Sequence, residues 1–517
     1  MTPPITSQRE AAIRQFITQT LDVLVVGGGI VGSGIARDAA MRGLGIGLVE
    51  QHDFAFGTSS RSSRLLHGGL RYLAQGRVGL VHEASVEKKV IHHIAPHLAE
   101  PLPFIFPTYR GNRNWVLWQL KIGVKIYDLL CGGRNLGKST WLNTQTVAAR
   151  VPALSQTNLT GAVRYYDGFT NDARLALDTL RSAARHGATV LNYMRFTGAE
   201  RKQLWECEVT DQLTGKAFQI KTRSIVNATG PWADGLSHST VKLRLTKGIH
   251  VVIERHRVPV PETVVMTEGK RILFAIPWGE RTILGTTDTD YSGDTDHVFA
   301  DAVDVEYVLN IANQFFPGAQ LESGDVISAW AGLRPLIADP NGKPSDISRS
   351  HEITNPQPGW WDVAGGKLTT YRLMAEQAVD RITQDLRAKH LLSQQLQSCR
   401  TATEFLLPRD EVDGLSGILP PEFNRSAVEH FCAREWAVHL DDVMVRRTSW
   451  HYYFRDAAEK AERVADWMSE LLGWSRAQRL DELARYRDLT GVALSTGRRV
   501  ATHTSSRVAF QEKSAHA

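Results

Sequence analysis

The sequence has few cysteines and no long apolar run, and each absence excludes a class of protein. Its four cysteines lie far apart among 517 residues and form no C-x-x-C pair. The sequence therefore predicts neither a disulfide framework nor a zinc site, and no other metal site is expected. A reducing compartment is expected instead. No apolar run approaches the ~18 residues that cross a bilayer. Charges at Arg9, Glu10 and Arg14 interrupt the apolar segment that a secretory signal would need.

The chain also lacks a strong excess of charge of one sign. Sixty Lys and Arg face fifty-five Asp and Glu, which leaves a net charge of +5. This balance argues against a nucleic-acid partner. With 42% hydrophobic and 22% charged residues over 517 positions, the composition is that of a globular protein of two or three domains.

A short apolar strand followed at once by a glycine turn is the clearest local pattern. Residues 21–26 (LDVLVV) predict a buried parallel strand, and residues 30–42 predict a helix rich in small side chains. Gly43 stands where a left-handed helix C-cap is expected, and residues 45–49 predict a second strand. Together these segments predict one βαβ unit.

The turn of this unit carries the pattern G-x-G-x-x-G as Gly27, Gly29 and Gly32, and Glu50 follows the second strand. The first two glycines let the backbone approach a pyrophosphate, and the third lets the helix pack on the strand. The helix N-terminus then offers unpaired N–H groups to the phosphates. Glu50 is predicted to accept hydrogen bonds from ribose hydroxyls and to repel a 2′-phosphate, which favours FAD or NAD over NADP.

Two later segments favour FAD over NAD. Residues 224–228 (SIVNA) lead into Thr229-Gly230, and residues 360–364 lead into Gly365-Gly366-Lys367. Both are predicted to be strands that end at a turn exposing backbone. Two such strand ends, far from the first unit, suit one large cofactor lying across a discontinuous domain, whereas a contiguous NAD module does not need them.

Residues 26–43 (VGGGIVGSGIARDAAMRG) and 365–375 (GGKLTTYRLMA) resemble two signatures of the FAD-dependent, quinone-linked glycerol-3-phosphate dehydrogenase family. Supporting matches are the segments 58–72 (TSSRSSRLLHGGLRY), 166–175, 227–232, 247–252, 276–288 and 332–336, with a looser match near Glu435 and residues 446–448.

This resemblance implies an α/β fold of the glutathione-reductase and D-amino-acid-oxidase kind. A Rossmann-like FAD-binding domain would be interleaved with an α+β substrate domain, and a helical domain would follow. The predicted boundaries are 19–95, 155–240 and 325–390 for the FAD-binding domain; 96–154 and 241–324 for the substrate domain; 400–497 for the C-terminal helical domain; and 498–517 for a tail.

Oxidation of an alcohol by a flavin needs a base for the hydroxyl proton and a positive environment for the reduced ring. His67, beside two glycines, is the first choice of base, because the pKa of imidazole lies near working pH; the alternative is a histidine that only bonds the flavin or fixes its loop. Lys367 and the helix predicted after it (368–378) would supply positive charge. Thr58, Ser59 and Ser60 are expected to donate to phosphate or flavin oxygens.

A dianionic phosphate needs fixed cations, and Arg334, in a stiff Gly-Leu-Arg-Pro loop, suits it best. Arg349 is the second candidate, with a surface arginine as the alternative. The resemblance assigns both to the phosphate and places Arg71, Tyr72, Thr287 and Lys367 around the remaining polar end, with His67, Arg71 and Lys367 as the catalytic group. Asp172 and Asp288 are expected to be structural. Implied cofactor contacts are Gly27, Gly29, Gly32, Glu50, Thr58, Ser59, Ser60, His67, Gly68, Gly69, Ala228, Thr229, Gly230, Gly365, Gly366, Lys367, Leu368 and Thr369.

Residues 113–130 are rich in tryptophan, lysine and apolar side chains. As a helix, this segment would carry Asn114, Lys121, Lys125 and Asp128 on one narrow stripe opposite a wide apolar face. Such a helix could lie among lipid headgroups or be buried against the body, and the pattern alone slightly favours burial. The resemblance favours the membrane, because it implies a cytoplasmic protein held at the inner face of the cell membrane.

The resemblance implies oxidation of sn-glycerol 3-phosphate to dihydroxyacetone phosphate, by hydride transfer from C2 to N5 of FAD, with a quinone as the final acceptor. Oxygen as acceptor, an amino-acid or sarcosine type of oxidase, and a non-catalytic FAD-binding subunit are the alternatives. A homodimer, the identity of the quinone and the role of the C-terminal domain stay open.

Overall fold

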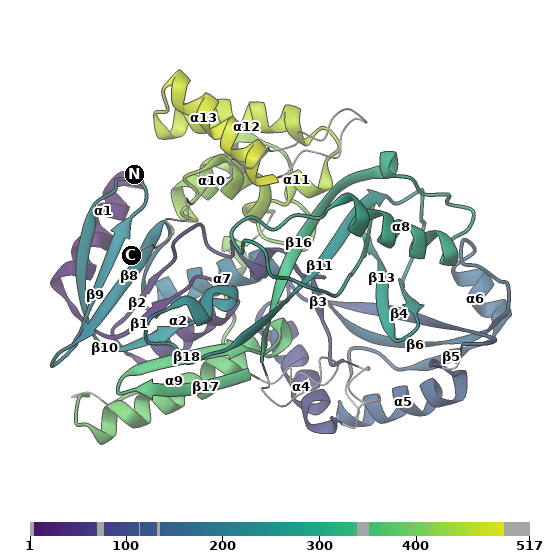
Figure 1. Ribbon diagram of the computed structural model, residues 1–517, viewed down its shortest axis with the longest axis horizontal. Coiled ribbons are helices and arrows are strands. Elements are labelled where there is room, and N and C mark those ends of the chain that lie inside the picture. The colour runs from purple at the N-terminus through teal and green to yellow at the C-terminus, as the bar shows by residue number, and fades with distance from the viewer. Residues whose placement is uncertain are drawn as a thin grey trace, which may run out of the picture.

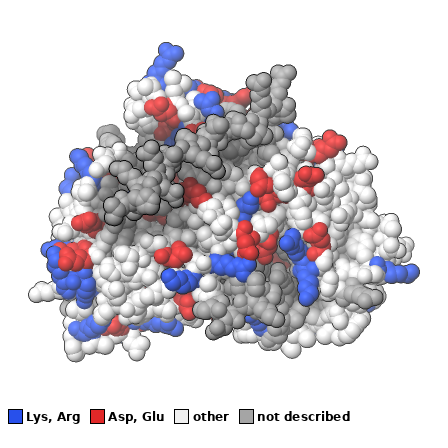
Figure 2. All heavy atoms as spheres, viewed as in Figure 1, with Lys and Arg blue, Asp and Glu red and all other residues white. Residues whose placement is uncertain are grey.

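The structure is a computed structural model that describes residues 5–69, 77–112, 114–131, 135–338, 351–392, 395–412 and 414–490. Two sheets lie side by side, and a group of C-terminal helices covers the junction between them (Figure 1). Basic and acidic side chains are interspersed over the face shown in Figure 2. No broad region of one sign is visible among the described residues of that face.

The first sheet holds eight strands among the described residues, with the central order β17-β18-β10-β1-β2-β7 and with β9 and β8 continuing from β10. Its strands are β1 (Thr20–Val26), β2 (Ile46–Val49), β7 (Thr189–Leu191), β8 (Met194–Arg201), β9 (Trp205–Asp211), β10 (Ala217–Asn227), β17 (His351–Gln357) and β18 (Trp360–Gly365).

The predicted βαβ unit is confirmed. Strands β1 and β2 pair in parallel, and helix α2 (Ile30–Arg42) connects them. Gly43 caps this helix in the left-handed conformation, and its N–H reaches the carbonyl of Ala40 at 2.9 Å. Strands β10 and β18, the two predicted strands after residue 220, extend the same parallel core beside β1. The three predicted strand ends therefore meet at one edge of the sheet.

The second sheet holds ten strands among the described residues and is mostly antiparallel, with β12 parallel to β4. Strands β13 and β14 form an antiparallel hairpin. The strands are β3 (Leu65–Leu66), β4 (Glu100–Tyr109), β5 (Thr140–Leu142), β6 (Leu159–Phe169), β11 (Leu243–Glu254), β12 (Thr263–Glu268), β13 (Arg271–Trp278), β14 (Arg281–Gly285), β15 (Thr289–Asp290) and β16 (Val326–Ile337).

Two strands lie differently from the predicted domain boundaries. The predicted FAD-binding domain includes residues 155–240, which contain strand β6, and residues 325–390, which contain strand β16. Both pair in the second sheet instead, β6 with β4 and β16 with β11 along their whole lengths. An apolar pattern can predict a strand, but it does not indicate which other strand will pair with it. The sheet to which β6 and β16 belong could therefore not be predicted from their sequences.

The helices surround both sheets. They are α1 (Ile5–Thr18), α4 (Val78–Ile94), α5 (Leu117–Leu130), α6 (Thr144–Arg150), α7 (Asp172–Arg185), α8 (Ala302–Phe315), α9 (Tyr371–Ala388), α10 (Arg425–Arg434), α11 (Trp450–Tyr453), α12 (Ala457–Leu472) and α13 (Arg476–Thr490); short turns are η1 (Thr58–Ser60), η2 (Gly230–Gly235), η3 (Ser323–Asp325), η5 (Leu368–Thr370), η6 (Arg409–Glu411) and a π-helical turn η7 (Asp442–Arg447).

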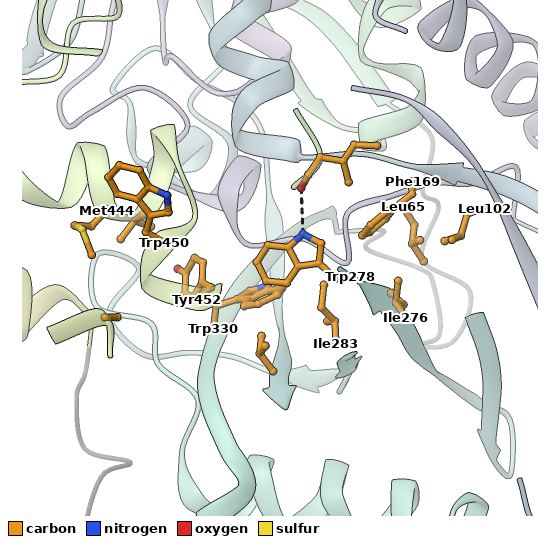
Figure 3. Close-up of a cluster of buried hydrophobic side chains, with 14 of the residues drawn as sticks. Leu65, Leu102, Phe169, Ile276, Trp278, Ile283, Trp330, Met444, Trp450 and Tyr452 are labelled. Atoms are coloured by element: carbon orange, nitrogen blue, oxygen red, sulfur yellow. Dashed lines mark hydrogen bonds between the residues drawn. The ribbon is translucent and has the colours of Figure 1, made fainter. Parts of the chain in front are cut away.

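The C-terminal helices share an apolar core with the second sheet. Trp330 from the sheet lies beside Tyr452 of α11, and Trp278 and Trp450 belong to the same cluster (Figure 3). The indole N–H of Trp278 donates to the carbonyl of Ile418 at 3.1 Å. Because these aromatic side chains are almost fully buried, separating the C-terminal helices from the sheet would expose a large apolar surface.

A buried ionic network ties the same helices to the first sheet. Asp53, which follows β2, accepts hydrogen bonds from Arg447 at 2.6 and 2.8 Å and from Arg446 at 2.5 Å. Arg174 of α7 pairs with Glu435 at 2.5 Å. All five side chains are buried. The two arginines and the glutamate belong to the C-terminal segments of the predicted family match.

Candidate active site

One cavity of about 480 Å³ lies where the carboxyl end of the first sheet faces the second sheet. Both signature turns open into it, together with the loops around residues 58–67, 228–232 and 332–336. Predicted site residues in its wall are Gly27, Gly29, Glu50, Thr58, Ser59, His67, Ala228, Thr229, Gly230, Arg334, Gly365, Gly366, Lys367 and Leu368. Segments more than 300 residues apart in the chain thus line the same space.

The first glycine turn is closely packed against its neighbours. A Cβ on Gly27 would lie 2.5 Å from the carbonyl oxygen of Ala228, and the backbone there has a φ of +111°. A Cβ on Gly32 would lie 2.0 Å from the carbonyl oxygen of Gly27. Any larger side chain at these positions would displace backbone, so glycine is required for the approach of turn, helix and strand.

The carboxylate of Glu50 lies at the end of β2 and faces the glycine turn. Its Oε2 accepts a hydrogen bond from the N–H of Gly28 at 2.7 Å, and its Oε1 accepts one from the N–H of His52 at 2.9 Å. Burial raises the pKa of this carboxyl group, against the effect of the two N–H donors. The residue is oriented toward the cavity by these two bonds, as an acceptor for ribose hydroxyls would need to be.

The serine and threonine residues of the 58–60 turn differ in position. Ser59 Oγ accepts from the N–H of Ile30 at 2.9 Å, at the start of α2. Thr58 Oγ1 donates to the carbonyl of Leu333 at 2.6 Å and so connects the turn to β16. Ser60 is buried away from the cavity wall. Two of the three predicted hydroxyl groups therefore border the cavity.

The second signature turn leaves β18 and enters a helix. Gly365 and Gly366 both have positive φ, at +72° and +81°, and a Cβ on Gly366 would lie 2.3 Å from Met374 Sδ. Lys367 follows in extended conformation and caps η5, which continues directly into α9. The predicted helix is thus confirmed, with one 3₁₀ turn at its start. Lys367 and these helix N–H groups give this wall a positive potential.

His67 borders the cavity from a loop after β3. The N–H of His67 donates to Thr369 Oγ1 at 3.1 Å, and Thr369 Oγ1 donates to the carbonyl of His67 at 3.2 Å. These bonds connect the His67 loop to the turn that carries Lys367. Gly68, Gly69 and Thr369 are buried behind the wall rather than in it.

Arg334 is held at the cavity wall by three acceptors. Its Nη1 lies 3.2 Å from Asp288 Oδ1, and its Nη2 donates to Thr286 Oγ1 at 3.1 Å and to the carbonyl of Thr287 at 3.2 Å. The side chain of Thr287 is buried and accepts from the N–H of Ile249 at 3.1 Å. Thr287 therefore orients Arg334 through its carbonyl, and its hydroxyl faces away from the cavity wall.

Three predicted residues lie outside the described ranges, namely Arg71, Tyr72 and Arg349. Their assigned roles stay predictions. Among the described residues, no cluster of His, Cys, Asp or Glu has the arrangement of a metal site.

Asp172, for which a structural role is predicted, borders the cavity and accepts hydrogen bonds from two backbone N–H groups. Its Oδ2 accepts from the N–H of Ser62 at 2.8 Å, and its Oδ1 accepts from the N–H of Ala173 at 3.0 Å. These bonds fix the start of α7 beneath the 58–67 loop.

His250 is a cavity residue to which the sequence analysis gave no role. It lies on β11, its ring stacks on Trp330, and its Nε2 lies 2.8 Å from Ser63 Oγ. Burial, with the nearby charges of Arg334 and Arg64, lowers the pKa of His250 to about 3, so its ring is neutral at physiological pH. The signal was a histidine inside the apolar run GIHVVI, where an inward polar side chain is unusual.

The fold and this cavity define a flavin-dependent oxidoreductase. A family described as "FAD dependent oxidoreductase" matches residues 22–381, and one described as "C-terminal domain of alpha-glycerophosphate oxidase" matches residues 373–479. The cofactor is therefore FAD.

Similar proteins define the family more narrowly. A glycerol-3-phosphate dehydrogenase of Mycobacterium leprae is 35% identical over 93% of this chain and 89% of its own. An aerobic glycerol-3-phosphate dehydrogenase of Staphylococcus epidermidis is 38% identical over 74% of this chain and 70% of its own. The Bacillus halodurans glycerol-3-phosphate dehydrogenase, solved with FAD, superposes with a TM-score of 0.75 at 27% identity, covering 95% of this chain and 99% of that one. The chain belongs to the glycerol-3-phosphate dehydrogenase and oxidase family of FAD-dependent oxidoreductases.

Proposed function

We propose that this protein oxidises sn-glycerol 3-phosphate to dihydroxyacetone phosphate and passes the electrons to a membrane quinone. The observation that carries this proposal is the shared cavity, in which an imidazole, a lysine beside a helix N-terminus and an arginine border the same space. Relatives named glycerol-3-phosphate dehydrogenase support the substrate.

The residues of the cavity suit a bound FAD. The Gly27 turn and the start of α2 would hold its pyrophosphate, Glu50 its ribose, and the Gly365–Lys367 turn its ring system. Bound FAD supplies an acceptor for the hydride on C2 of the substrate. Ala228 lies so close to Gly27 that a Cβ on Gly27 would have no room. A glycine turn without side chains is what the close approach of a pyrophosphate to the backbone needs.

Each polar group has a proposed task. His67 accepts the proton of the C2 hydroxyl, because imidazole is a base near neutral pH. Lys367 and the N-terminus of η5 stabilise the negative charge that develops on the reduced ring. Arg334 binds the phosphate, since its planar guanidinium makes paired bonds with phosphate oxygens. Arg71, Tyr72 and Arg349 complete the proposed substrate site.

The outer face of α5 supports contact with a membrane. Leu120, Val124 and Tyr127 of this helix are buried against the body. The opposite face, which we call the outer stripe, is apolar and exposed; it consists of Trp118 (60% exposed), Ile122 (53%), Ile126 (41%) and Leu129 (75%).

Further features around the outer stripe fit a lipid surface. Lys121 extends over the ring of Trp141, which is 60% exposed, and Lys125 is also exposed. Within the described residues, no helix is long and apolar enough to cross a bilayer. We therefore propose that the outer stripe lies in the headgroup region of the inner face of the cell membrane, with the two lysines near anionic lipid.

The substrate proposal is tested by mixing the FAD-loaded protein anaerobically with phosphorylated and free polyols. We expect glycerol 3-phosphate to bleach the visible flavin absorption and free glycerol to leave it unchanged. Bleaching by an amino acid instead would assign the protein to the amino-acid oxidases. Absence of bleaching with every compound would favour a non-catalytic FAD-binding subunit.

The acceptor is tested by reoxidation of the bleached protein in a stopped-flow instrument. A soluble quinone analogue is expected to restore the flavin absorption much faster than dissolved oxygen. Fast reaction with oxygen and none with the quinone would replace the dehydrogenase by an oxidase.

A further inference from the structure

Gly68, the residue after His67, is held by a cluster of buried polar side chains. The N–H of Gly68 lies 3.0 Å from Tyr127 Oη and 3.3 Å from Asp167 Oδ1. Tyr127 belongs to α5 and Asp167 to β6, so two elements outside the cofactor-binding sheet reach the same peptide group.

Lys88 of α4 completes this group, which we call the Gly68 cluster (Lys88, Tyr127 and Asp167). Lys88 Nζ donates to Asp167 Oδ1 at 2.8 Å and lies 3.3 Å from Tyr127 Oη. Tyr127 Oη donates to the same carboxylate oxygen at 2.5 Å. Because Tyr127 Oη uses its hydrogen in the bond to Asp167, the same oxygen accepts the hydrogen bond from the N–H of Gly68. The three side chains are almost fully buried.

The loop is packed tightly against this cluster. A Cβ on Gly68 would lie 2.3 Å from Tyr127 Oη and 2.9 Å from Ser85 Oγ. The approach therefore requires glycine and a correctly placed phenol oxygen. Burial of a charged pair costs desolvation free energy that apolar packing does not. A buried polar network in which every member is hydrogen-bonded makes the surrounding chain more rigid.

The His67 peptide is thus held from two sides. Thr369, two residues after Lys367, bonds both backbone groups of His67. The Gly68 cluster holds the next N–H from the opposite direction. We propose that Lys88, Tyr127 and Asp167 are positioning residues that fix the imidazole of His67 relative to Lys367. This inference rests on the proposed function, because it gives the position of His67 a consequence for the reaction.

Removal of the phenol oxygen should act on the chemical step rather than on substrate binding. In Tyr127→Phe, the N–H of Gly68 keeps only the longer contact with Asp167, so the loop gains freedom. A misplacement of a reacting group by about 1 Å costs on the order of 100-fold in rate. The proposed phosphate site at Arg334 contains no member of the cluster. We expect the rate of flavin reduction by glycerol 3-phosphate to fall 10- to 100-fold, with a smaller change in KM because the Arg334 site is untouched.

Tyr165→Phe is the matched control. Tyr165 is also buried, its ring lies 6.2 Å from that of Tyr127, and its hydroxyl makes no hydrogen bond within the described part of the chain. Both variants lose one buried phenol oxygen from the same core. Equal losses of reduction rate, or a Tyr127→Phe variant as fast as the wild type, would overturn the inference.

A second readout needs no substrate. Amide hydrogen exchange is measured on the FAD-loaded proteins over the peptide that contains Leu66 to Gly69. We expect at least 10-fold faster exchange at Gly68 in Tyr127→Phe and wild-type exchange in Tyr165→Phe. Suppose that exchange at Gly68 is faster in Tyr127→Phe but glycerol 3-phosphate does not reduce the wild type. This result would refute the proposed function, whereas the conclusion that the cluster holds the loop would stand. Unchanged exchange would refute the positioning role even if the wild type is reduced.

The opposite side of the loop provides a variant that leaves the cluster intact. Thr369→Val removes the hydroxyl that bonds His67, and Thr369→Ser retains it. We expect the valine variant to lose reduction rate as Tyr127→Phe does and the serine variant to recover most of it. If Tyr127→Phe fails to fold, Lys88→Met takes its place, because Lys88 belongs to the same cluster. A Lys88→Met variant with the wild-type reduction rate and wild-type exchange at Gly68 would overturn the inference.

Discussion

Arg334 and Asp288 form an ion pair at the cavity wall, with Nη1 3.2 Å from Oδ1. The proposed phosphate would meet the same guanidinium, so the carboxylate competes with it. Since Asp288 is 40% exposed, its attraction for Arg334 is weak, on the order of 1 kcal/mol or less. We expect Asp288→Asn to lower KM for glycerol 3-phosphate by up to about 5-fold with kcat unchanged. Asp290→Asn, which breaks the nearby pair with Arg244, is the control, and steady-state kinetics decide between them.

Arg334→Ala should have the opposite and larger effect. Hydrogen bonds to charged groups contribute about 1.5–3 kcal/mol each, and each 1.4 kcal/mol is about tenfold in affinity. We expect KM for glycerol 3-phosphate to rise by roughly 100-fold. Arg244→Ala removes an arginine that does not line the cavity and should leave KM unchanged. An unaltered KM in Arg334→Ala would refute the phosphate assignment.

The outer stripe of α5 can be tested on vesicles. Replacement of Ile122 and Leu129 by glutamate should abolish flotation with vesicles that contain anionic lipid, because two apolar side chains are lost and two negative charges are added. Both residues are exposed, so the fold should persist. Leu213→Glu, at an exposed leucine of the β9–β10 turn, is the control. Flotation of the double variant at the wild-type level would contradict membrane contact through this face.

The pair between Asp53 and Arg447 should dominate the stability of the C-terminal domain. Asp53→Asn leaves the buried guanidinium of Arg447 without its carboxylate, whereas Arg446 keeps Asp441 and Asp442. Breaking a buried pair costs about 3–5 kcal/mol. We expect a clear fall in the thermal unfolding midpoint. Asp466→Asn, which breaks an exposed pair with Arg479, should leave the midpoint nearly unchanged. Equal midpoints for the two variants would show that the buried pair is not needed.

His250 should make the protein sensitive to acid. Its pKa is about 3 in the folded protein and about 6.5 in an unfolded chain. Between these values the unfolded state binds one more proton, so this group lowers stability as pH falls below about 6.5, by up to about 1.4 kcal/mol per pH unit. His250→Phe should therefore show a smaller fall of the unfolding midpoint from pH 7 to pH 5 than the wild type. His297→Phe, at an exposed site, should retain the full fall.

The nucleotide end could be predicted from sequence because its determinants are local. The strand, glycine turn, helix, Gly43 cap and second strand follow one another within 31 residues, and each was found as predicted. The two later strand ends were also recognisable, since a buried apolar run followed by glycines has few other structures.

Long-range pairing could not be predicted in the same way. The sequences of β6 and β16 do not indicate that β4 and β11 are their partners. Helix α5 shows the same limit: the sequence indicated one wide apolar face, whereas the structure buries part of it and exposes the rest. Asn114 precedes this helix, and Asp128 accepts hydrogen bonds from Ser139 rather than facing solvent with the lysines. His250 acquires its role only through Ser63 and Trp330, which are far away in the chain.

The position of Asp53 also has a consequence for synthesis on the ribosome. The segment that carries it leaves the exit tunnel early, but its two guanidinium partners lie 393 and 394 residues further along. Until residues 446 and 447 have been translated, this carboxylate lacks both guanidinium partners. The loop that follows Glu50 therefore reaches its final form only after residue 447 has been made, and capture of the flavin nucleotide by a nascent chain should be correspondingly late.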